Sequence, residues 1–438
     1  MRLVNASIAT PAMTRVHPVH SVHPVHSVHS VHSVHSVHFV HLVHPVHVIS
    51  VLFATLAMTG ALAESYPLKV MPAEHKRMND PVTNTELTFL TTAPGKNLNA
   101  YFYQQAWLHD GSAILFNSDR NEGGAMAYLV QTGELVMLRT PKGPLRQPVA
   151  SMKRPVFFAR RGREVLELRI DLTISADLAK TPSTATLEER VICLMPEGSH
   201  SSYLTENPDG TKLTLGMGGI KGESRSAIFV VDIASGEVKE ACSFPDPPGF
   251  AWHVQWSWTD PNLIGFAGRP QRLMTVDIRD GRPYNVYKAW DDELATHESS
   301  WVNGQVLFCG GTHPKPAEDS HVKVLDLATG TVRVIGPGAW WPGANAQDLA
   351  KVNWWHASGS RDGRWVAADN WHGDIMLFDA KTARPRLLTT GHRTYGHGEH
   401  PHVAWDQTGK STIFGSEMLG DPNVCVAKIP DAWQTENP

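Results

Sequence analysis

Residues 391–405, GHRTYGHGEHPHVAW, concentrate side chains that could bind a metal ion. They include four histidines, His392, His397, His400 and His402. His400 and His402 are two positions apart, so on a regular strand both side chains point to the same face. Neutral imidazole nitrogens suit Zn²⁺, Mn²⁺, Fe²⁺ or Ni²⁺, and a His-x-His pair with a distant third histidine is a frequent ligand pattern. The stretch is compatible with a metal site, a substrate pocket or a polar turn, and the fold must decide between them.

The elements that position these histidines are short β-rich runs that recur after residue 64. Asp-Gly and Asn-Gly hairpin signals divide runs such as WLHDGSAILF, WVNGQVLFCG and SGSRDGRWVAAD. Most runs are followed by a third strand and a second turn, as in VKVLDLATGTV. Seven such units recur about every 45–55 residues, which is the period of a propeller with four strands per blade, whereas helical solenoids lack this turn-rich pattern. The sequence predicts an all-β, seven-bladed β-propeller over residues 64–438.

The last unit of this repeat is one strand short. The stretch TELTFLTT, residues 85–92, could supply the missing outer strand and close the ring. Closure in this way would remove an exposed sheet edge.

Four histidines share a position within their repeat units. His297, His356 and His402 each lie seven residues before the glycine of the next hairpin turn, and His253 holds a similar place before a longer turn. In a propeller the first strand of each blade lines the central channel. A lone histidine is more often a hydrogen-bonded core residue than a ligand, but four in register around one axis favour a shared site. The corresponding residues of the first and third units are Gln104 and Tyr203.

Several longer stretches carry a resemblance to a known family. They are YFYQQAWLHDGSAILF (101–116), SSYLTENPDG (201–210), WHVQWSWTDPNLIGF (252–266), THESSW (296–301) and HGEHPHVAWDQTGKSTIFGSEMLGDPNVCVAKIP (397–430). These stretches resemble the oligogalacturonate lyases, polysaccharide lyase family 22, and the similarity runs over most of residues 80–435. The resemblance implies a seven-bladed propeller, in agreement with the repeat count.

The resemblance also implies a metal site. The metal ligands of the family correspond to His297, His400 and His402. Its fourth ligand is a glutamine three residues before the His-Pro-His element, and His397 stands at that position here. The family uses Mn²⁺, and a fourth imidazole would favour softer ions such as Zn²⁺ or Ni²⁺. A second departure is FAGRP (266–270), where the family has His-Glu-Gly-Pro, so substrate contacts there can differ.

The catalytic residues that the resemblance implies are His253 as the base and Arg225 beside it. Uronate lyases remove the C5 proton, which becomes acidic enough when a metal neutralises the adjacent carboxylate. A neutral imidazole can take that proton near neutral pH. Arg225 would keep His253 unprotonated and bind a substrate carboxylate; without the resemblance, a salt bridge on a blade edge explains it equally well. His356 is expected to bind substrate.

Three functions remain open at this point. The first is a metal-dependent lyase that cleaves oligogalacturonides by β-elimination, as in pectin degradation. The second is an exported, non-catalytic propeller that binds glycan or protein. The third is another metalloenzyme on the same scaffold, such as a lyase for a different uronate-containing glycan or a hydrolase. The fold alone does not choose between them, and the sequence leaves the uronate, its chain length, the metal and the oligomeric state open.

Two further segments precede the repeats. From His17 to His47 a histidine falls at every third position, accounting for eleven of the 24 histidines. Residues 1–47 are typical of translated tandem-repeat DNA upstream of a true start, with a metal-binding tail as the alternative. Residues 48–63, VISVLFATLAMTGALA, have the apolar run and A-x-A end of a signal peptide and are too short for a membrane span. They predict export to the periplasm or the extracellular space.

Composition limits the partners of the protein. The formal net charge is −4, and no basic stripe or charge block is present. These features argue against nucleic acid, and against a membrane surface for the mature form. The four cysteines form no Cys-x-x-Cys pair, which argues against a thiolate metal site and leaves one or two disulfides open. The partner that the family resemblance implies is an oligogalacturonide or a related oligouronide.

Overall fold

The structure is a computed structural model that describes residues 64–245, 252–312, 318–396 and 398–436. The histidine-rich tract 1–47 and the signal peptide 48–63 lie outside the described residues, and so does His397. The predictions made for these three parts of the chain therefore remain predictions.

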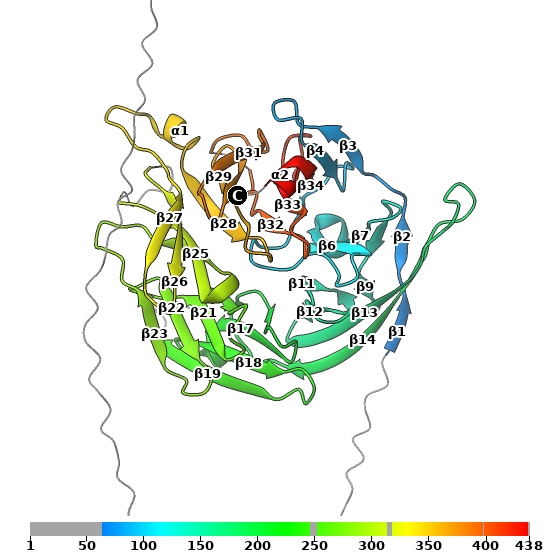
Figure 1. The fold of residues 1–438 in the computed structure, drawn as a ribbon. Coiled ribbons are helices and arrows are strands. Elements are labelled where there is room, and N and C mark those ends of the chain that lie inside the picture. The colour runs from blue at the N-terminus through cyan, green and yellow to red at the C-terminus, as the bar shows by residue number, and fades with distance from the viewer. Residues whose placement is uncertain (1–63, 246–251, 313–317, 397, 437–438) are drawn as a thin grey trace, which may run out of the picture. The chain divides into compact units, whose positions relative to one another are not determined.

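Seven antiparallel sheets form the seven blades of a β-propeller around a common axis (Figure 1). The all-β, seven-bladed fold predicted from the repeats is confirmed. Within most blades the strands follow one another in the sheet in the same order as in the sequence. Each blade therefore begins with its innermost strand, which places the first strand of every repeat next to the axis.

The first three blades lie between residues 97 and 245. Their strands are β5 (Asn97–Leu98), β6 (Ala113–Ser118), β7 (Gly124–Leu129) and β8 (Leu135–Met137); β11 (Arg146–Ala150), β12 (Phe157–Arg161), β13 (Glu164–Thr173) and β14 (Thr184–Leu194); and β15 (His200–Ser201), β16 (Thr205–Glu206), β17 (Lys212–Gly218), β18 (Arg225–Asp232) and β19 (Val238–Pro245). A separate two-stranded sheet joins β9 (Arg139–Thr140) and β10 (Gly143–Pro144).

The last four blades carry the histidines in register. Their strands are β20 (Trp252–Trp256), β21 (Leu263–Ala267), β22 (Leu273–Asp277) and β23 (Pro283–Tyr287); β24 (Thr296–Ser300), β25 (Gln305–Gly310), β26 (His321–Asp326) and β27 (Val332–Gly336); β28 (Trp354–Gly359), β29 (Trp365–Asn370), β30 (Ile375–Asp379) and β31 (Pro385–Thr389); and β32 (Ala404–Trp405), β33 (Ser411–Ser416) and β34 (Asn423–Lys428). The described residues also form two short α-helices, α1 (Ala346–Leu349) and α2 (Asp431–Thr435), and three 3₁₀ helices, Asp119–Asn121, Ile220–Gly222 and Val302–Gly304. None of the helices in the described ranges is long and apolar enough to cross a membrane.

The ring closes through the N-terminal segment, as predicted for residues 85–92. Strand β4 (Glu86–Phe89) pairs with β34 of the last blade, with Phe89 opposite Cys425. The N-terminal segment also supplies outer strands that the sequence did not predict. Strand β3 (Lys76–Asn79) covers β4, β2 (Lys69–Met71) adds to β8, and β1 (Glu64–Pro67) adds to β14. Three blades thus receive their outer strands from residues 64–89, which covers three sheet edges with one stretch of chain.

The blades are held together by apolar side chains and by tryptophans that reach from one blade to the next. Trp301 is fully buried and donates a hydrogen bond from Nε1 to the Ser360 carbonyl oxygen at 2.9 Å. Trp405 donates in the same way to the carbonyl oxygen of Ser358 at 3.0 Å. These two tryptophans pack between blades. All four cysteines of the chain are buried free thiols, so the structure contains no disulfide.

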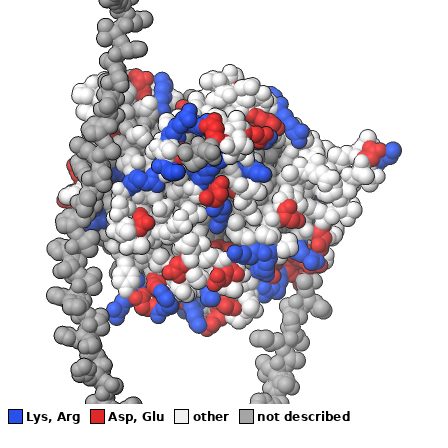
Figure 2. Space-filling view, viewed as in Figure 1, with Lys and Arg blue, Asp and Glu red and all other residues white. Residues whose placement is uncertain are grey.

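The hairpin turns have the backbone geometry that their sequences require. Gly363 and Gly409 have φ angles of 74° and 69°, a region that residues with a Cβ rarely adopt. The turns therefore fix the register of the inner strands that precede them. Charged residues of both signs are interspersed on the face of the propeller seen in Figure 2, so this face is not expected to produce a long-range field of one sign.

Candidate active site

The four histidines in register lie on or just before the innermost strands of four successive blades. His253 is in β20, His297 in β24, His356 in β28, and His402 lies two residues before β32 begins. His253, His297 and His402 share a positive φ, of 53°, 51° and 50°. Positive φ is uncommon for residues other than glycine and is concentrated at functional sites.

β-bulges explain the unusual backbone at two of these positions. The pairing register of β20 shifts between Trp252 and Gln255, and that of β24 shifts between Thr296 and Ser299. Each shift brackets one of the histidines. A bulge re-aims the side chain it carries, so the same local distortion turns both rings out of the regular alternation of the strand.

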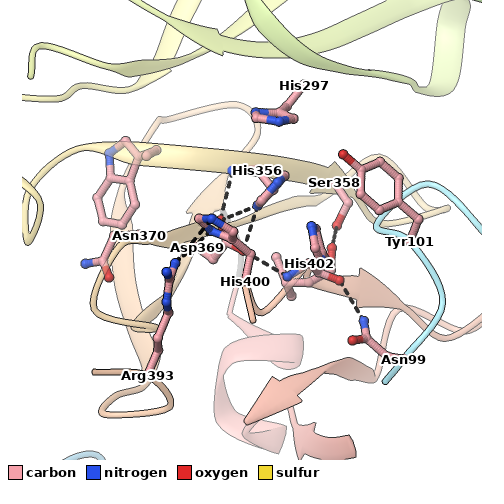
Figure 3. Close-up of polar contacts among 12 residues, drawn as sticks. Asn99, Tyr101, His297, His356, Ser358, Asp369, Asn370, Arg393, His400 and His402 are labelled. Atoms are coloured by element: carbon pink, nitrogen blue, oxygen red, sulfur yellow. Dashed lines mark hydrogen bonds and ion pairs between the residues drawn. The ribbon is translucent and has the colours of Figure 1, made fainter. Parts of the chain in front are cut away.

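The histidine rings meet near the propeller axis, with His356 at the centre (Figure 3). The ring centroid of His356 lies 4.3 Å from that of His297, 4.4 Å from that of His402 and 5.3 Å from that of His400. His253 is next to His297, at 5.6 Å between ring centroids. Side chains that are separated by up to about 150 residues in the sequence thus form one cluster. His392 is not part of it, because its ring is buried between Thr389 and Ser416.

Burial keeps the clustered rings in the neutral form. It lowers the pKa of His297 and of His356 well below the usual value, and neighbouring histidines lower both further. Burial also lowers the pKa of His400 to about 4 and that of His402 to about 4, although the Asp369 carboxylate acts in the opposite direction on both. At neutral pH these four imidazoles therefore retain a nitrogen lone pair, the form in which histidine binds metals.

Asp369 on β29 organises the centre of the cluster. Its carboxylate is fully buried and accepts hydrogen bonds from the backbone N–H of His356 at 2.8 Å and of His402 at 2.9 Å. The same carboxylate lies 3.0 Å from Nδ1 of His356. Because a carboxylate accepts, Nδ1 carries the proton and Nε2 of His356 keeps its lone pair. A carboxylate behind a histidine is a common way to orient a metal-binding or substrate-binding ring.

Three of the predicted metal ligands, His297, His400 and His402, lie in this cluster, although the structure does not arrange them as a coordination sphere. Among the described residues, no three His, Cys, Asp or Glu side chains are positioned as a ready metal site. The ring of His400 is engaged by Arg393, whose Nη1 lies 2.9 Å from Nδ1. The ligand set of His297, His397, His400 and His402 therefore stays a prediction.

His253 has its own set of partners beside the cluster. Its Nε2 lies 2.9 Å from the Tyr101 hydroxyl, and its Nδ1 lies 3.0 Å from Nη2 of Arg272 and 3.3 Å from Oε1 of Glu298. Glu298 also accepts a hydrogen bond from Nε of Arg272 at 3.0 Å. Burial alone would raise the pKa of Glu298, but the Arg272 guanidinium and the His253 ring outweigh burial and lower the pKa to about 2. The site thus contains an ionised carboxylate directly behind His253.

Arg225, the arginine that the family resemblance places beside the base, has different partners in the described structure. It begins β18 and forms ion pairs with Glu223 and Glu240, each at 2.8 Å. The arginine that contacts His253 is Arg272. A catalytic or substrate-binding role for Arg225 stays a prediction, and Arg272 is the better placed of the two.

Sequence reasoning missed several residues of this site. Tyr101 lies in the stretch YFYQQAW and Glu298 directly follows His297 in THESSW, so both stood in stretches that carried the resemblance without being assigned a role. Arg272 and Asp369 have no comparable local signal. Asp369 lies on β29, the second strand of its blade, and Arg272 directly precedes β22, the third strand of its blade, so only the packing of the sheets brings them to the site.

Comparisons with known proteins agree with this architecture. No protein-family model matches the sequence, and no curated protein is significantly similar to it in sequence. Among solved structures, an oligogalacturonate lyase from Vibrio parahaemolyticus matches with a TM-score of 0.64 and 17% identity, over 84% of this chain and 100% of that chain. An oligogalacturonate lyase in complex with manganese matches with a TM-score of 0.63 and 18% identity, over 85% of this chain and 99% of that one. The protein is therefore similar in fold to oligogalacturonate lyases, which confirms the resemblance found in its sequence at the level of structure.

Proposed function

We propose that this protein is a metal-dependent lyase that cleaves oligogalacturonides by β-elimination. The observation that carries the proposal is the cluster of neutral imidazoles around His356 with His253 beside it, on a propeller similar in fold to oligogalacturonate lyases. The cluster supplies nitrogen donors, and His253 supplies a base next to them.

The donor set fits a divalent ion such as Mn²⁺, with Zn²⁺ or Ni²⁺ as alternatives. In the described part of the chain the His402 ring makes no hydrogen bond, and that of His297 makes only a long one, 3.4 Å from Nδ1 to the Thr296 hydroxyl. His297, His397, His400 and His402 would hold the ion once His400 is released from Arg393. The manganese complex of a lyase similar in fold supports Mn²⁺. When bound, the ion would neutralise the uronate carboxylate and so make the C5 proton more acidic.

The residues around His253 can perform the proton transfer. We infer that Arg272 turns from His253 to a carboxylate of the substrate, for which its planar guanidinium is suited. Nδ1 of His253 can then carry the ring proton and donate a hydrogen bond to Glu298. This tautomer leaves the lone pair on Nε2, which removes the C5 proton. The electrons of the C5–H bond form the C4–C5 double bond as the C4–O bond breaks, and the leaving glycosidic oxygen takes up a proton from water. Arg225 remains a second candidate for binding a substrate carboxylate, and Nε2 of His356 can accept a hydrogen bond from a substrate hydroxyl.

An ultraviolet assay with several oligouronides tests this proposal. We expect absorbance to rise with oligogalacturonides, because the 4,5-unsaturated product is conjugated with its carboxylate. Treatment with a chelator should abolish the reaction and added Mn²⁺ should restore it. A carbonyl assay should run in parallel, because some unsaturated products rearrange to keto acids. Product from another uronate alone would assign a different substrate, and no product from any of them would favour a glycan- or protein-binding propeller without catalytic activity.

Metal selectivity should depend on His397. An amide oxygen is a harder donor than imidazole, so His397→Gln is expected to shift preference toward Mn²⁺ and to weaken binding of Zn²⁺ and Ni²⁺. His397→Ala should weaken all three ions, because it leaves three protein ligands. Metal content and activity measured across the three ions check both variants. If selectivity is unchanged in both, His397 only caps the turn before the inner strand.

We also propose that the protein is exported to the periplasm or the extracellular space. The proposal rests on residues 48–63, whose apolar run and A-x-A end are those of a signal peptide. N-terminal sequencing of the mature protein should give a start near Glu64. A mature chain that retains residues 48–63 would contradict it.

A further inference from the structure

A second cavity lies on the other side of the segment YFYQQ, residues 101–105, from the histidine cluster. Because every blade repeats the same order of strands, the inner strands run in the same direction along the axis. The cavity is lined by residues two to five positions after the histidine register, such as Gln255, Trp258 and Arg361. At about 3.3 Å per residue, these positions lie about 7–17 Å further along the axis. Tyr101 contacts His253, and Tyr103 lies between the two regions, with its ring centroid 5.9 Å from that of His253 and its side chain in the wall of the cavity.

The cavity is small and has a mixed aromatic and polar wall. Its volume is about 130 Å³, below the roughly 300–1,000 Å³ of sites for drug-sized molecules, so it admits only a small ligand. Its walls come from the first four blades and the sixth, and they combine the rings of Trp256 and Trp258 with polar side chains. Neither the fold comparison nor the histidine cluster assigns a role to it.

Arg361 provides an unpaired positive charge in this wall. Its guanidinium lies over the ring of Trp258, 3.7 Å from the ring centroid. Within the described part of the chain, the guanidinium has no hydrogen bond or ion pair. The nearby acid, Glu206, is already bonded to the Ser151 hydroxyl at 2.7 Å and to the backbone N–H of Met152 at 2.8 Å. Burial lowers the pKa of Arg361 to about 10 although the Glu206 carboxylate raises it, so the group stays charged at neutral pH.

Three buried polar atoms in the residues that line the cavity also lack partners. They are the Tyr103 hydroxyl, the Thr205 hydroxyl and Nε1 of Trp256, none of which has a hydrogen bond among the described residues. Buried polar groups in proteins are nearly always paired, and unpaired ones are concentrated where a ligand or water binds. Hydroxyl and indole groups among the same lining residues as an unpaired guanidinium match a ligand that carries hydroxyls as well as a negative charge.

We propose that this cavity is a second binding site, for a small hydroxylated carboxylate such as a sugar acid. The guanidinium of Arg361, which stacks on the ring of Trp258, pairs with the carboxylate of the ligand through two parallel hydrogen bonds. The groups of Tyr103, Thr205 and Trp256 pair with the hydroxyls of the ligand after small side-chain rotations. The proposal does not depend on the lyase activity, because Arg361, which carries the charge of this site, lies outside the histidine cluster.

Calorimetric titration of galacturonate into the full-length His402→Ala variant tests the proposal, since this background weakens the histidine site. Introduced into this background, Arg361→Gln removes the positive charge of the cavity wall. Arg333→Gln, on the outer strand β27, is the matched control. We expect galacturonate to bind to the His402→Ala variant and to the Arg333→Gln control. Arg361→Gln should weaken the affinity for galacturonate at least about tenfold, because it removes a hydrogen-bonded charge. Galactose and acetate should bind at least about tenfold more weakly than galacturonate, because each lacks one half of the recognised chemistry.

Two results of the titrations would contradict the second binding site. Unchanged affinity in Arg361→Gln would overturn the proposal, as would equal affinity for galacturonate, galactose and acetate. A crystal soaked with galacturonate provides a check that does not depend on the fold of a variant. Ligand density beside Arg361 supports the site, and a cavity filled by water alone contradicts it.

Discussion

Replacement of His253 by alanine is expected to reduce turnover by about 10²–10⁴-fold, the usual contribution of a general base. The bound metal should remain, because the His253 ring contacts Tyr101 and Arg272 at the edge of the cluster. Steady-state rates on oligogalacturonide together with metal analysis of the purified variant measure both effects. This result would separate the residue that removes the proton from those that hold the ion.

A matched histidine gives the control for this experiment. His109 is exposed in the first hairpin turn of blade one, so His109→Ala should leave both turnover and metal content unchanged. Loss of metal in His253→Ala would make His253 a ligand, and the role assigned to it would be wrong. Normal turnover in His253→Ala would place the base elsewhere.

Asp369→Ala is expected to lower the free energy of unfolding by about 3–5 kcal/mol, as when one partner of a buried polar pair is removed. The carboxylate is fully buried and accepts from two backbone N–H groups and from Nδ1 of His356. Alanine leaves all three donors without a partner in the protein interior. Burial raises the pKa of Asp369, and the rings of His400 and His402 offset only part of this effect. Urea denaturation followed by tryptophan fluorescence measures the loss.

Two variants make the Asp369 experiment specific. Asp369→Asn keeps the volume and one acceptor oxygen, so its effect should lie between those of wild type and alanine. Asp379 is also buried in blade six, but it caps a turn by accepting from the backbone N–H groups of Lys381 and Thr382. Asp379→Ala should cost about 1–2 kcal/mol, the usual effect of losing a cap. Equal losses in Asp369→Ala and Asp379→Ala would show that Asp369 does not organise the cluster.

Much of the fold could be predicted because its signals are local. Each hairpin is encoded by two apolar runs and a turn within about twelve residues, and the repeat of this pattern indicated the number of blades. The closing strand β4 could be predicted because the last repeat lacked a partner. The pairing of β1 with β14 and of β2 with β8 could not, since nothing in the short segment 64–71 encodes which sheet edge it will meet.

Some residues of the candidate site could also be predicted from the sequence, and others could not. The sequence by itself indicated that His297, His356 and His402 stand at one height on successive inner strands, because each lies seven residues before a hairpin glycine, and it gave His253 a similar place before a longer turn. Only the tertiary structure decided that Arg272 rather than Arg225 contacts His253, that Asp369 fixes the tautomer of His356, and that Arg361 faces a second cavity. These contacts join residues of different strands and blades. Their partners are chosen by how strands and blades pack around the axis, and the spacing of residues along the chain carries no record of that packing.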